Sequence, residues 1–299
     1  MNTQVTDLVY HQSESETTIN RVLYIRDGKQ AEIAVGPNDL VFVTLGSMTA
    51  GSSLGTMTAA PILGSKYSGG SWTLWETIAK NHPEFGNPSV FDGHIEQTLW
   101  ESFTITFSDP LFFRLMKDFT GNEAGTGGLV TFKDSNWLMS VVLPHQPHFL
   151  NQPENINVCW GYGLFPTKPG NFVQKRMSEC TGAEIMTELL SHLRFEKHAP
   201  SILDSAICIP SMMPFITSQF MPRVKGDRPP VIPQGFTNLA FIGQYCEIAD
   251  DVVFTVEYSI RSAQTSVYSM LKLDKEVSPI YKGQYDLSVL FNSAKSIFN

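Results

Sequence analysis

The sequence lacks several features that would define its location or chemistry at once. It has no apolar run of about 18 residues, the length that reads as a membrane span, and no basic stretch followed by an apolar one at its start, the mark of a signal peptide. Its four cysteines, Cys159, Cys180, Cys208 and Cys246, are too widely spaced for a zinc site or a redox pair. We therefore expect a cytoplasmic chain without a disulfide framework.

Basic residues are also scarce. The chain has 21 Lys and Arg against 29 Asp and Glu, a net charge of -8. A nucleic-acid-binding protein needs a basic face to neutralise phosphates, so this class of protein is disfavoured. With 299 residues, 42% of them hydrophobic, the chain is long enough for one large or two small domains with a real core.

The first part of the sequence favours β structure. Residues 4–45 contain two runs, Arg21–Arg26 and Gln30–Val35, that flank the hairpin signal Asp27-Gly28. The run Asp39–Gly46 follows as a buried strand, and residues 46–70 form a long loop. Further strands are predicted at Gly128–Phe132, Trp137–Leu143, Val158–Leu164 and Leu239–Gly243.

Four helices have recognisable starts. Ser71 is expected to cap a helix that buries Trp72, Trp75 and Ile78, and Asp109-Pro110 opens a helix over 111–119. The sequence Thr181-Gly-Ala-Glu184 has capping-box spacing. The last helix spans Val256–Leu271, and its predicted apolar face is Val256, Ile260, Ala263, Val267 and Leu271.

Strands and helices alternate without a clear linker, so the expected fold class is α/β, or mixed α+β. The proline-rich residues 209–235 are expected to form an irregular ordered loop.

The strongest local signal for chemistry is a strand, a glycine and a helix start in succession. The predicted strand Leu239–Gly243 ends at a glycine that lets a ligand approach the backbone, and a helix begins near Thr255. The first N–H groups of a helix and its partial positive charge suit an anionic or electron-rich ligand. An ordinary strand–loop–helix connection explains the same pattern.

A second signal is the strand end Thr44-Leu-Gly46-Ser47, which resembles the second dinucleotide-binding motif of two-domain flavoproteins. The expected first motif, G-x-G-x-x-G after a strand, is missing, and the glycines of Gly125–Gly128 have the wrong spacing for it. The chain therefore holds only part of a dinucleotide site.

Other motifs are weaker. His145 and His148 have no further ligands nearby to complete a zinc set, so no metal is predicted. The cluster Arg223, Lys225 and Arg228 is either a solvated loop or an anchor for a carboxylate. No G-x-S-x-G nucleophile motif is present.

Three long stretches resemble the oleate hydratases, also called the myosin-cross-reactive antigens: GNEAGTGGLVTFKDSNWLMSVVLPHQPHFLNQPENINVCWGYGLFP, CIPSMMPFITSQFMPRVKGDRP and NLAFIGQYCEIADDVVFTVEYSIRSAQTSVY. The resemblance covers essentially the whole chain and implies the carboxy-terminal half of a two-domain FAD-binding fold without its first βαβ dinucleotide-binding unit. It implies FAD as cofactor, and hydration of the cis-9 double bond of oleate or related unsaturated fatty acids to 10-hydroxy acids. The catalytic acid and base are expected in the missing amino-terminal half, so this chain alone is expected to be inactive.

The resemblance also implies a division of labour along the chain. Residues 1–58 and 236–299 belong to the FAD-binding region, and residues 59–235 form the substrate-binding region. The expected cofactor contacts are Thr44, Gly46, Ser47, Gly243, Gln244, Val253, Phe254, Thr255 and Val256. The expected fatty-acid contacts are Asn136, His145, Gln146, His148, Gln219 and Arg223.

Besides the fatty acid, the partners considered are the amino-terminal half, a second copy in a homodimer and a peripheral contact with a membrane. Two other functions stay open at this point. One is a flavin-dependent oxidoreductase of the amine oxidase or desaturase type, which would share both cofactor motifs. The other is a non-catalytic, truncated lipid-binding remnant.

Overall fold

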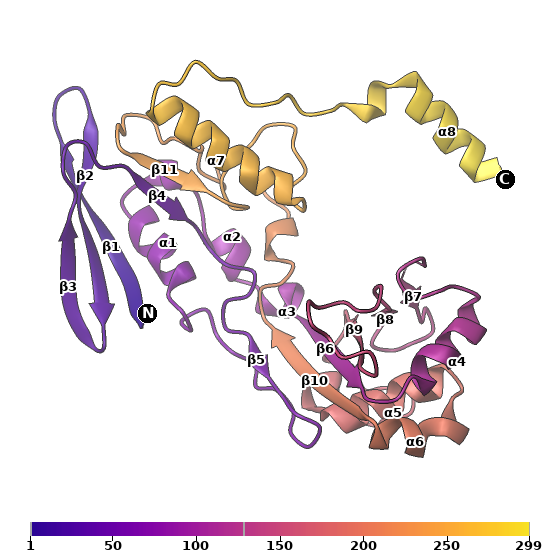
Figure 1. Ribbon diagram of the computed structural model, residues 1–299. Helices are drawn as coiled ribbons and strands as arrows, with labels where there is room; N and C mark the ends of the chain where they lie inside the picture. Colours follow the sequence, from indigo (N-terminus) through magenta and orange to yellow (C-terminus); the bar gives the residue numbers. More distant parts are fainter. Residues whose placement is uncertain (1, 128, 299) are drawn as a thin grey trace.

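The computed structural model describes residues 2–127 and 129–298 and shows a mixed α/β fold, as predicted (Figure 1). The start of the predicted strand Gly128–Phe132 and the end of the motif Gly125–Gly128 lie outside the described residues. The strands are β1 (Thr3–Gln12), β2 (Thr17–Arg26), β3 (Lys29–Ala34), β4 (Val41–Thr44), β5 (Ser53–Leu54), β6 (Trp100–Phe107), β7 (Val130–Thr131), β8 (Met139–Val142), β9 (Asn157–Gly163), β10 (Ala206–Met213) and β11 (Leu239–Ile242). The helices are α1 (Ser71–Ala79), α2 (Ser89–Asp92), α3 (Ile95–Thr98), α4 (Leu111–Thr120), α5 (Gly182–His192), α6 (Ala199–Asp204), α7 (Val256–Met270) and α8 (Leu287–Phe298).

The chain begins with an antiparallel meander in the order β1-β2-β3. The predicted hairpin at Asp27-Gly28 is confirmed, and both residues have positive φ, 49° and 76°. Two consecutive left-handed residues give the tight turn that matches the twist of the flanking strands.

Strands β4 and β11 come from distant parts of the sequence and pair in parallel, with Val41 opposite Leu239 and Thr44 opposite Ile242. The buried amide of Asn238 fastens the start of β11 to β2. It accepts a hydrogen bond from the Ile19 N–H and donates one to the Ile19 carbonyl, each at 2.8 Å.

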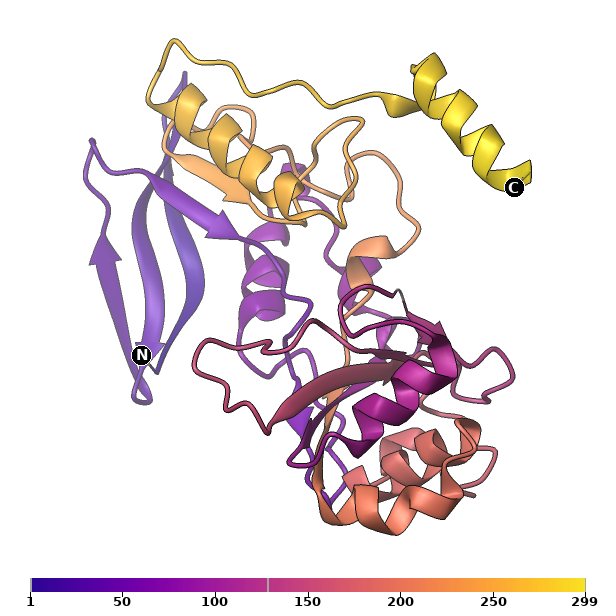
Figure 2. The same cartoon turned by 45° about the vertical axis from the view of Figure 1, so that its right-hand side comes forward.

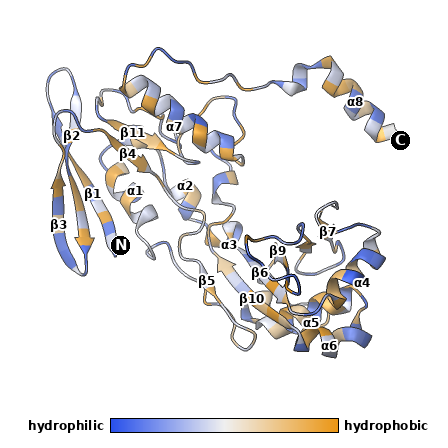
Figure 3. Cartoon of the chain, viewed as in Figure 1, coloured by the Kyte–Doolittle hydropathy of each residue, from blue (hydrophilic) through white to orange (hydrophobic). Residues whose placement is uncertain are grey.

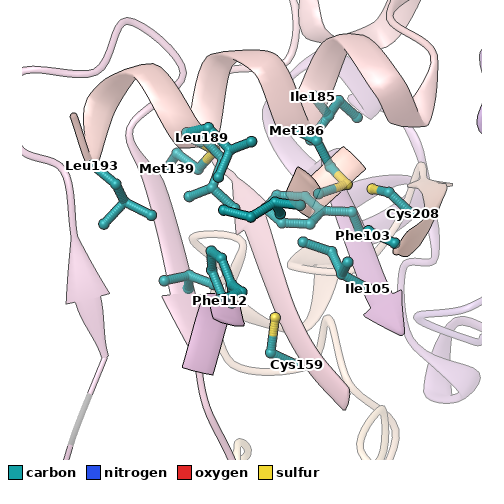
Figure 4. Packing of buried hydrophobic residues seen from close by; sticks show 14 of the residues in the cluster. Phe103, Ile105, Phe112, Met139, Cys159, Ile185, Met186, Leu189, Leu193 and Cys208 are labelled. Atoms are coloured by element: carbon teal, nitrogen blue, oxygen red, sulfur yellow. The ribbon is translucent and has the colours of Figure 1, made fainter. Parts of the chain in front are cut away.

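The remaining strands form a six-stranded sheet in the order β5-β10-β6-β9-β8-β7, with antiparallel neighbours. One face of this sheet is packed against α4, α5 and α6 (Figures 1 and 2). Figure 4 shows the resulting core, in which Phe103 and Ile105 of β6 meet Ile185, Met186 and Leu189 of α5. The α5 capping box is confirmed: Thr181 accepts from the Glu184 N–H and Glu184 accepts from the Thr181 N–H.

A second core lies under the meander and the β4–β11 pair. It joins Leu8 and Ile19 to Trp72 and Trp75 of α1, and to residues after β10 such as Phe215, Phe236, Phe241 and Tyr245. Chain segments from both ends of the sequence therefore share one core, while the six-stranded sheet has its own.

The predictions of local structure omit some elements and misplace others. The central strands β6 and β10 are absent from the prediction, and residues 209–213, expected in an irregular loop, complete β10. Pro210 made this segment look unlike a strand, because proline is rare in the middle of a sheet. Its carbonyl nevertheless accepts a hydrogen bond from the Gly55 N–H at the neighbouring strand β5. The α1 cap position is occupied by Gly70, with φ 80°, and Ser71 is the first helical residue.

Helix α7 has the predicted extent, but it buries the opposite face. The buried residues are Tyr258, Ser262 and Ser266, whereas Val256 is 71% exposed and Ile260 is 50% exposed. Figure 3 shows polar and apolar bands mixed along this helix. The small serines let α7 approach β11 closely, because the Ser262 Oγ accepts the Gly243 N–H at 2.9 Å.

Helix α8 extends away from the rest of the chain (Figures 1 and 2). No helix among the described residues is long and apolar enough to cross a membrane.

The carboxyl group of Glu101 on β6 lies in the apolar core of the six-stranded sheet. Its side chain is fully buried, and neither oxygen has a hydrogen-bond partner among the described residues. Burial alone raises the pKa of Glu101 from 4.5 to about 9. The folded protein therefore holds this group as the neutral acid at pH 7.

This burial predicts a pH-dependent stability that Glu101→Gln removes. Between pH 4.5 and about 9, the folded chain binds one proton more than the unfolded chain at this position, so the free energy of unfolding falls as pH rises. The loss is ~1.4 kcal/mol per pH unit, or about 3 kcal/mol by pH 7. In urea denaturation, we expect the variant to match the wild type near pH 5 and to exceed it at pH 8.

The matched control is Glu96→Gln, at an exposed position. A wild-type stability that does not fall between pH 5 and 8, or that falls equally in the Glu101 variant, would contradict the neutral assignment.

Candidate functional site

The carboxyl ends of β4 and β11 bring Thr44 and Gly243 together. Thr44 lies opposite Ile242, and Gly243 follows at once with φ 94°. A Cβ atom built on Gly243 would lie 3.1 Å from the Thr44 Cγ2, and no other atom of the described residues would lie within 4 Å outside its chain neighbours. The backbone at Gly243 is therefore open to a ligand on the side where a side chain would project.

Gly46 has a different environment. It is buried, and a Cβ atom there would meet the Trp72 ring at 2.8 Å and the Tyr245 ring at 3.0 Å. Packing within the chain is enough to explain this glycine. The neighbouring Ser47 forms a hydrogen bond within its own loop, in which its hydroxyl accepts the Thr49 N–H at 3.3 Å.

The loop after β11 leads to the start of α7. The Thr255 hydroxyl caps the helix by accepting the Tyr258 N–H at 3.3 Å. Gln244 and Val253 are half-buried, whereas the side chains of Phe254 and Val256 are exposed. The expected cofactor residues thus occupy one continuous region, made of two strand ends, this loop and the first turn of α7.

A buried hydrogen-bond network holds this loop in place. The Tyr258 hydroxyl donates to the Cys246 carbonyl at 2.7 Å and accepts the Ile248 N–H at 3.1 Å. It also accepts from the Arg228 Nη1 at 3.3 Å. Burial raises the pKa of the Tyr258 phenol, and the Arg228 charge opposes that shift. One hydroxyl therefore joins the loop, the helix and the chain segment before β11.

Arg228 itself is an unusual buried cation. It is 2% exposed, its Nη2 donates to the Gln219 carbonyl at 2.7 Å, and its guanidinium lies over the rings of Phe91 and Tyr258. No ion pair among the described residues includes it. A positive charge is therefore buried beside the first turn of α7, where the helix already presents a partial positive charge.

The sequence alone missed this network. It grouped Arg228 with Arg223 and Lys225 in one basic cluster, but the structure separates them. The Arg223 Nη1 lies 3.0 Å from the Glu247 Oε2 in an ion pair, and Lys225 is exposed. The sequence identified Tyr258 only as a residue of a predicted helix, because the hydrogen-bond partners of its hydroxyl are not its neighbours in sequence.

The expected fatty-acid contacts fall in two places. Asn136, His145, Gln146 and His148 lie on loops around β8, whereas Gln219 and Arg223 follow β10. The Gln146 amide braces its loop by bonding both the N–H and the carbonyl of Val158, at 3.0 and 2.9 Å.

The exposures of these residues also differ. Asn136, His145 and His148 are exposed. Gln219 is buried, and its side-chain oxygen has no partner within the described part of the chain. In the same part, no group of three or more His, Cys, Asp and Glu side chains is arranged to hold a metal ion.

A cavity of about 1020 Å³ lies at the other end of the β4–β11 pair. Its lining includes Asn38 and Leu40 before β4, Asn238 before β11, and Leu271 after α7. None of the expected cofactor or substrate residues lines it.

Comparisons with known proteins give two kinds of match. The family model described as the MCRA family matches residues 1–268. An oleate hydratase of Streptococcus pyogenes serotype M49 (strain NZ131) is 41% identical over 304 aligned residues, which cover 98% of this chain and 51% of the relative. A linoleate hydratase of Lactiplantibacillus plantarum is 31% identical over 292 residues, covering 91% of this chain and 51% of the relative. The chain thus spans about half the length of the curated relatives it matches.

The packing around Gly46 predicts that Gly46→Ala destabilises the chain. The new methyl group would overlap the Trp72 and Tyr245 rings, at a cost of about 1–3 kcal/mol. Gly28→Ala is the matched control, because Gly28 also has positive φ but nothing within 4 Å. In urea denaturation, the free energy of unfolding should fall clearly more for Gly46→Ala than for Gly28→Ala. Equal decreases would show that both substitutions act only through backbone strain at a positive φ.

The buried network predicts a cost for Tyr258→Phe. The substitution leaves the Ile248 N–H and one Arg228 N–H without their acceptor, so the free energy of unfolding should fall by about 2–4 kcal/mol. The control is Tyr285→Phe, at an exposed tyrosine. A melting temperature unchanged by Tyr258→Phe would mean that the hydroxyl does not secure the loop.

Proposed function

The chain belongs to the MCRA family, and we propose that it forms part of an FAD-dependent fatty-acid hydratase. The supporting observation is the 41% identity to an oleate hydratase over 98% of this chain. Both curated relatives are named hydratases of unsaturated fatty acids, which favours water addition over the oxidoreductase alternative. The proposed substrate is oleate or a related acid with a cis-9 double bond, and the proposed product is the 10-hydroxy acid.

The residues at the ends of β4 and β11 fit part of a flavin dinucleotide site. Gly243 leaves an open backbone, Thr44 lies beside it, and the start of α7 supplies helix N–H groups. When bound, the flavin would supply a structural and electrostatic element without net oxidation of the substrate. The buried charge of Arg228 would favour electron-rich parts of such a ligand.

The rest of the cofactor site is proposed to come from the part of the relatives' length that this chain does not match. The sequence has no G-x-G-x-x-G motif to surround a pyrophosphate. In this proposal, residues 1–58 and 236–299 contact the cofactor and residues 59–235 shape the substrate site. The cytoplasmic location, the homodimer and a membrane contact stay predictions.

The reaction adds water across the double bond. One alkene carbon gains a proton and the other gains the hydroxyl of a water molecule, so an acid and a water-activating base are needed. We assign neither role to a residue of this chain. Its proposed contribution is to position the cofactor and the fatty acid, with Gln219 and Arg223 among the polar groups near the substrate.

A chimera tests the proposed function. Residues 1–299 replace the matched half of the Streptococcus pyogenes relative, and the purified chimera is incubated with oleate. We expect hydroxy acid to form, detected by mass spectrometry as the addition of one water. A folded, FAD-loaded chimera that leaves oleate unchanged would refute the proposal.

A substitution in the same chimera tests the cofactor contact. Gly243→Val would place a branched side chain in the open space and should weaken FAD binding by about 1–3 kcal/mol, tenfold for each ~1.4 kcal/mol. Gly28→Val introduces valine at a similar positive φ, away from the proposed site, and should leave FAD affinity unchanged. Equal affinities of both variants in a fluorescence titration would mean that Gly243 belongs to a purely structural turn.

A further inference from the structure

A carboxyl group beside the second core lacks the contacts that a buried charge needs. The side chain of Asp92, the last residue of α2, is 0% exposed, and neither of its oxygens has a hydrogen-bond partner among the described residues. Its ion pair is with Lys66, whose Nζ lies 3.7 Å from the Asp92 Oδ2. The same ammonium lies closer to a second carboxylate, 2.5 Å from the Glu76 Oε1 on α1. One cation is therefore shared by two acids, and the buried acid has the poorer contact.

This arrangement favours the neutral form of Asp92. Burial is the largest cause that raises the pKa of Asp92, and the Glu76 carboxylate raises it further, whereas Lys66 lowers it. The balance moves this pKa from 3.8 to about 6. The turn Ser218–Phe220, which also packs against α2, has no ionisable side chain, and the Arg228 guanidinium lies over the ring of the residue before Asp92. Ionisation of Asp92 thus leaves a buried charge that is only partly compensated.

Lys66 reaches Asp92 from a short segment that has glycines at both ends, Gly64–Gly70. Lys66 and Glu76 are partly exposed while Asp92 is not, so both lie on the solvent side of the buried carboxyl group. Gly69 and Gly70, just before α1, have φ of 98° and 80°, and a Cβ atom on Gly69 would meet nothing within 4 Å. Glycines in this position can absorb the backbone change of a hinge.

The other end of the segment touches the loop that follows β4. A Cβ atom on Gly64 would overlap the Gly51 carbonyl oxygen, so the two backbones are in direct contact there. Gly51 lies seven residues after Thr44, the last residue of β4. A movement of the segment would therefore also change the packing of the loop after β4.

We propose that Gly64–Gly70 is a pH-sensitive flap, which is closed over Asp92 while this residue is protonated and is released when it ionises. Release lets water reach the carboxyl group, so its pKa returns from about 6 toward 3.8. The closed form then binds the proton more tightly than the open form, and a rise in pH favours opening. The inference needs neither cofactor nor fatty acid, so it stands apart from the proposed function.

The expected size of the response follows from the two pKa values. Between 3.8 and about 6, the equilibrium constant for opening should rise by about tenfold for each pH unit. The total rise is then about a hundredfold at most, and the constant should level off above this range.

Proteinase K cleavage of the whole chain tests the proposal. The protease cuts after aromatic residues such as Tyr67, and a folded segment must leave its place before it can be cut. The cleavage rate at Tyr67 is divided by that of a free peptide of residues 60–72 at the same pH, which removes the pH dependence of the protease. We expect this ratio to rise by more than about tenfold from pH 4.5 to pH 7. A ratio that does not change with pH would overturn the proposal.

Asp92→Asn is the decisive variant, because it keeps the shape of the side chain and removes its titration. The ratio should be low at both pH values. Glu96→Gln, at an exposed carboxylate on the neighbouring helix α3, is the matched control and should keep the wild-type response. An Asp92→Asn variant that melts like the wild type and still responds to pH would refute the flap.

Glu76→Gln gives a second variant should Asp92→Asn not fold. It removes the negative charge next to Asp92 and leaves the Lys66 ammonium to that residue alone, so the midpoint of the response should move to lower pH. A midpoint that stays where it is in the wild type would count against the assignment to Asp92.

Global unfolding also depends on pH, through Glu101, and must be told apart from the flap. The measurement is therefore repeated with Glu101→Gln, which removes that dependence. We expect the same response, with the first cut still at Tyr67. Loss of the response in this variant would assign the cleavage to global unfolding and overturn the proposal.

Discussion

The parallel pairing of β4 with β11 is the contact on which the proposed cofactor site depends. It brings Thr44 and Gly243 to one edge, and the Ser262 hydroxyl then ties that edge to α7. Asn238 fastens the other end of β11 to the meander through Ile19. Without this pairing, the open glycine, the loop and the helix start would have no fixed relation to one another.

Charge is distributed in an unusual way around the two cores. The core of the six-stranded sheet contains a neutral carboxyl group at Glu101, whereas the β6 residues that point away from this core, Trp100, Ser102, Thr104 and Thr106, are uncharged. Near α7, a buried cation at Arg228 has two aromatic rings, the Gln219 carbonyl and the Tyr258 hydroxyl in place of a carboxylate. The buried carboxyl group and the buried cation each cost folding free energy unless other interactions compensate for them. Buried ionisable groups of this kind are common where a protein binds a ligand.

Local signals in the sequence predicted local structure well. The turn at Asp27-Gly28, the capping box at Thr181 and the start of α7 all depend on residues within a few positions of one another. Strands β6 and β10 were missed because Glu101 and Pro210 break the patterns that strands usually show. Their places are set by pairing with each other across the sheet, which no short window of sequence reveals.

The candidate site was predictable in outline only. The order of strand, glycine and helix gave the position of Gly243, but sequence could not separate its open space from the packed environment of Gly46. Hydrophobic periodicity identified the apolar face of α7, but it did not show which face of the helix packs against the rest of the chain. Ser262 is buried because it meets Gly243, and Tyr258 because it meets Arg228, and both contacts join distant segments.

The separation of β4 and β11 along the chain also affects the order in which the protein is built. All six strands of the larger sheet, β5 to β10, are synthesised between them. The pairs β7–β8 and β8–β9 of that sheet join consecutive strands and can form early, whereas β4 must wait for β11, and contacts of long sequence separation form late. During that interval β4 has no parallel partner, and an unpaired strand edge is a template for pairing with other chains. A ribosome that pauses after Met213 would lengthen this vulnerable interval and leave the nascent chain in need of a chaperone.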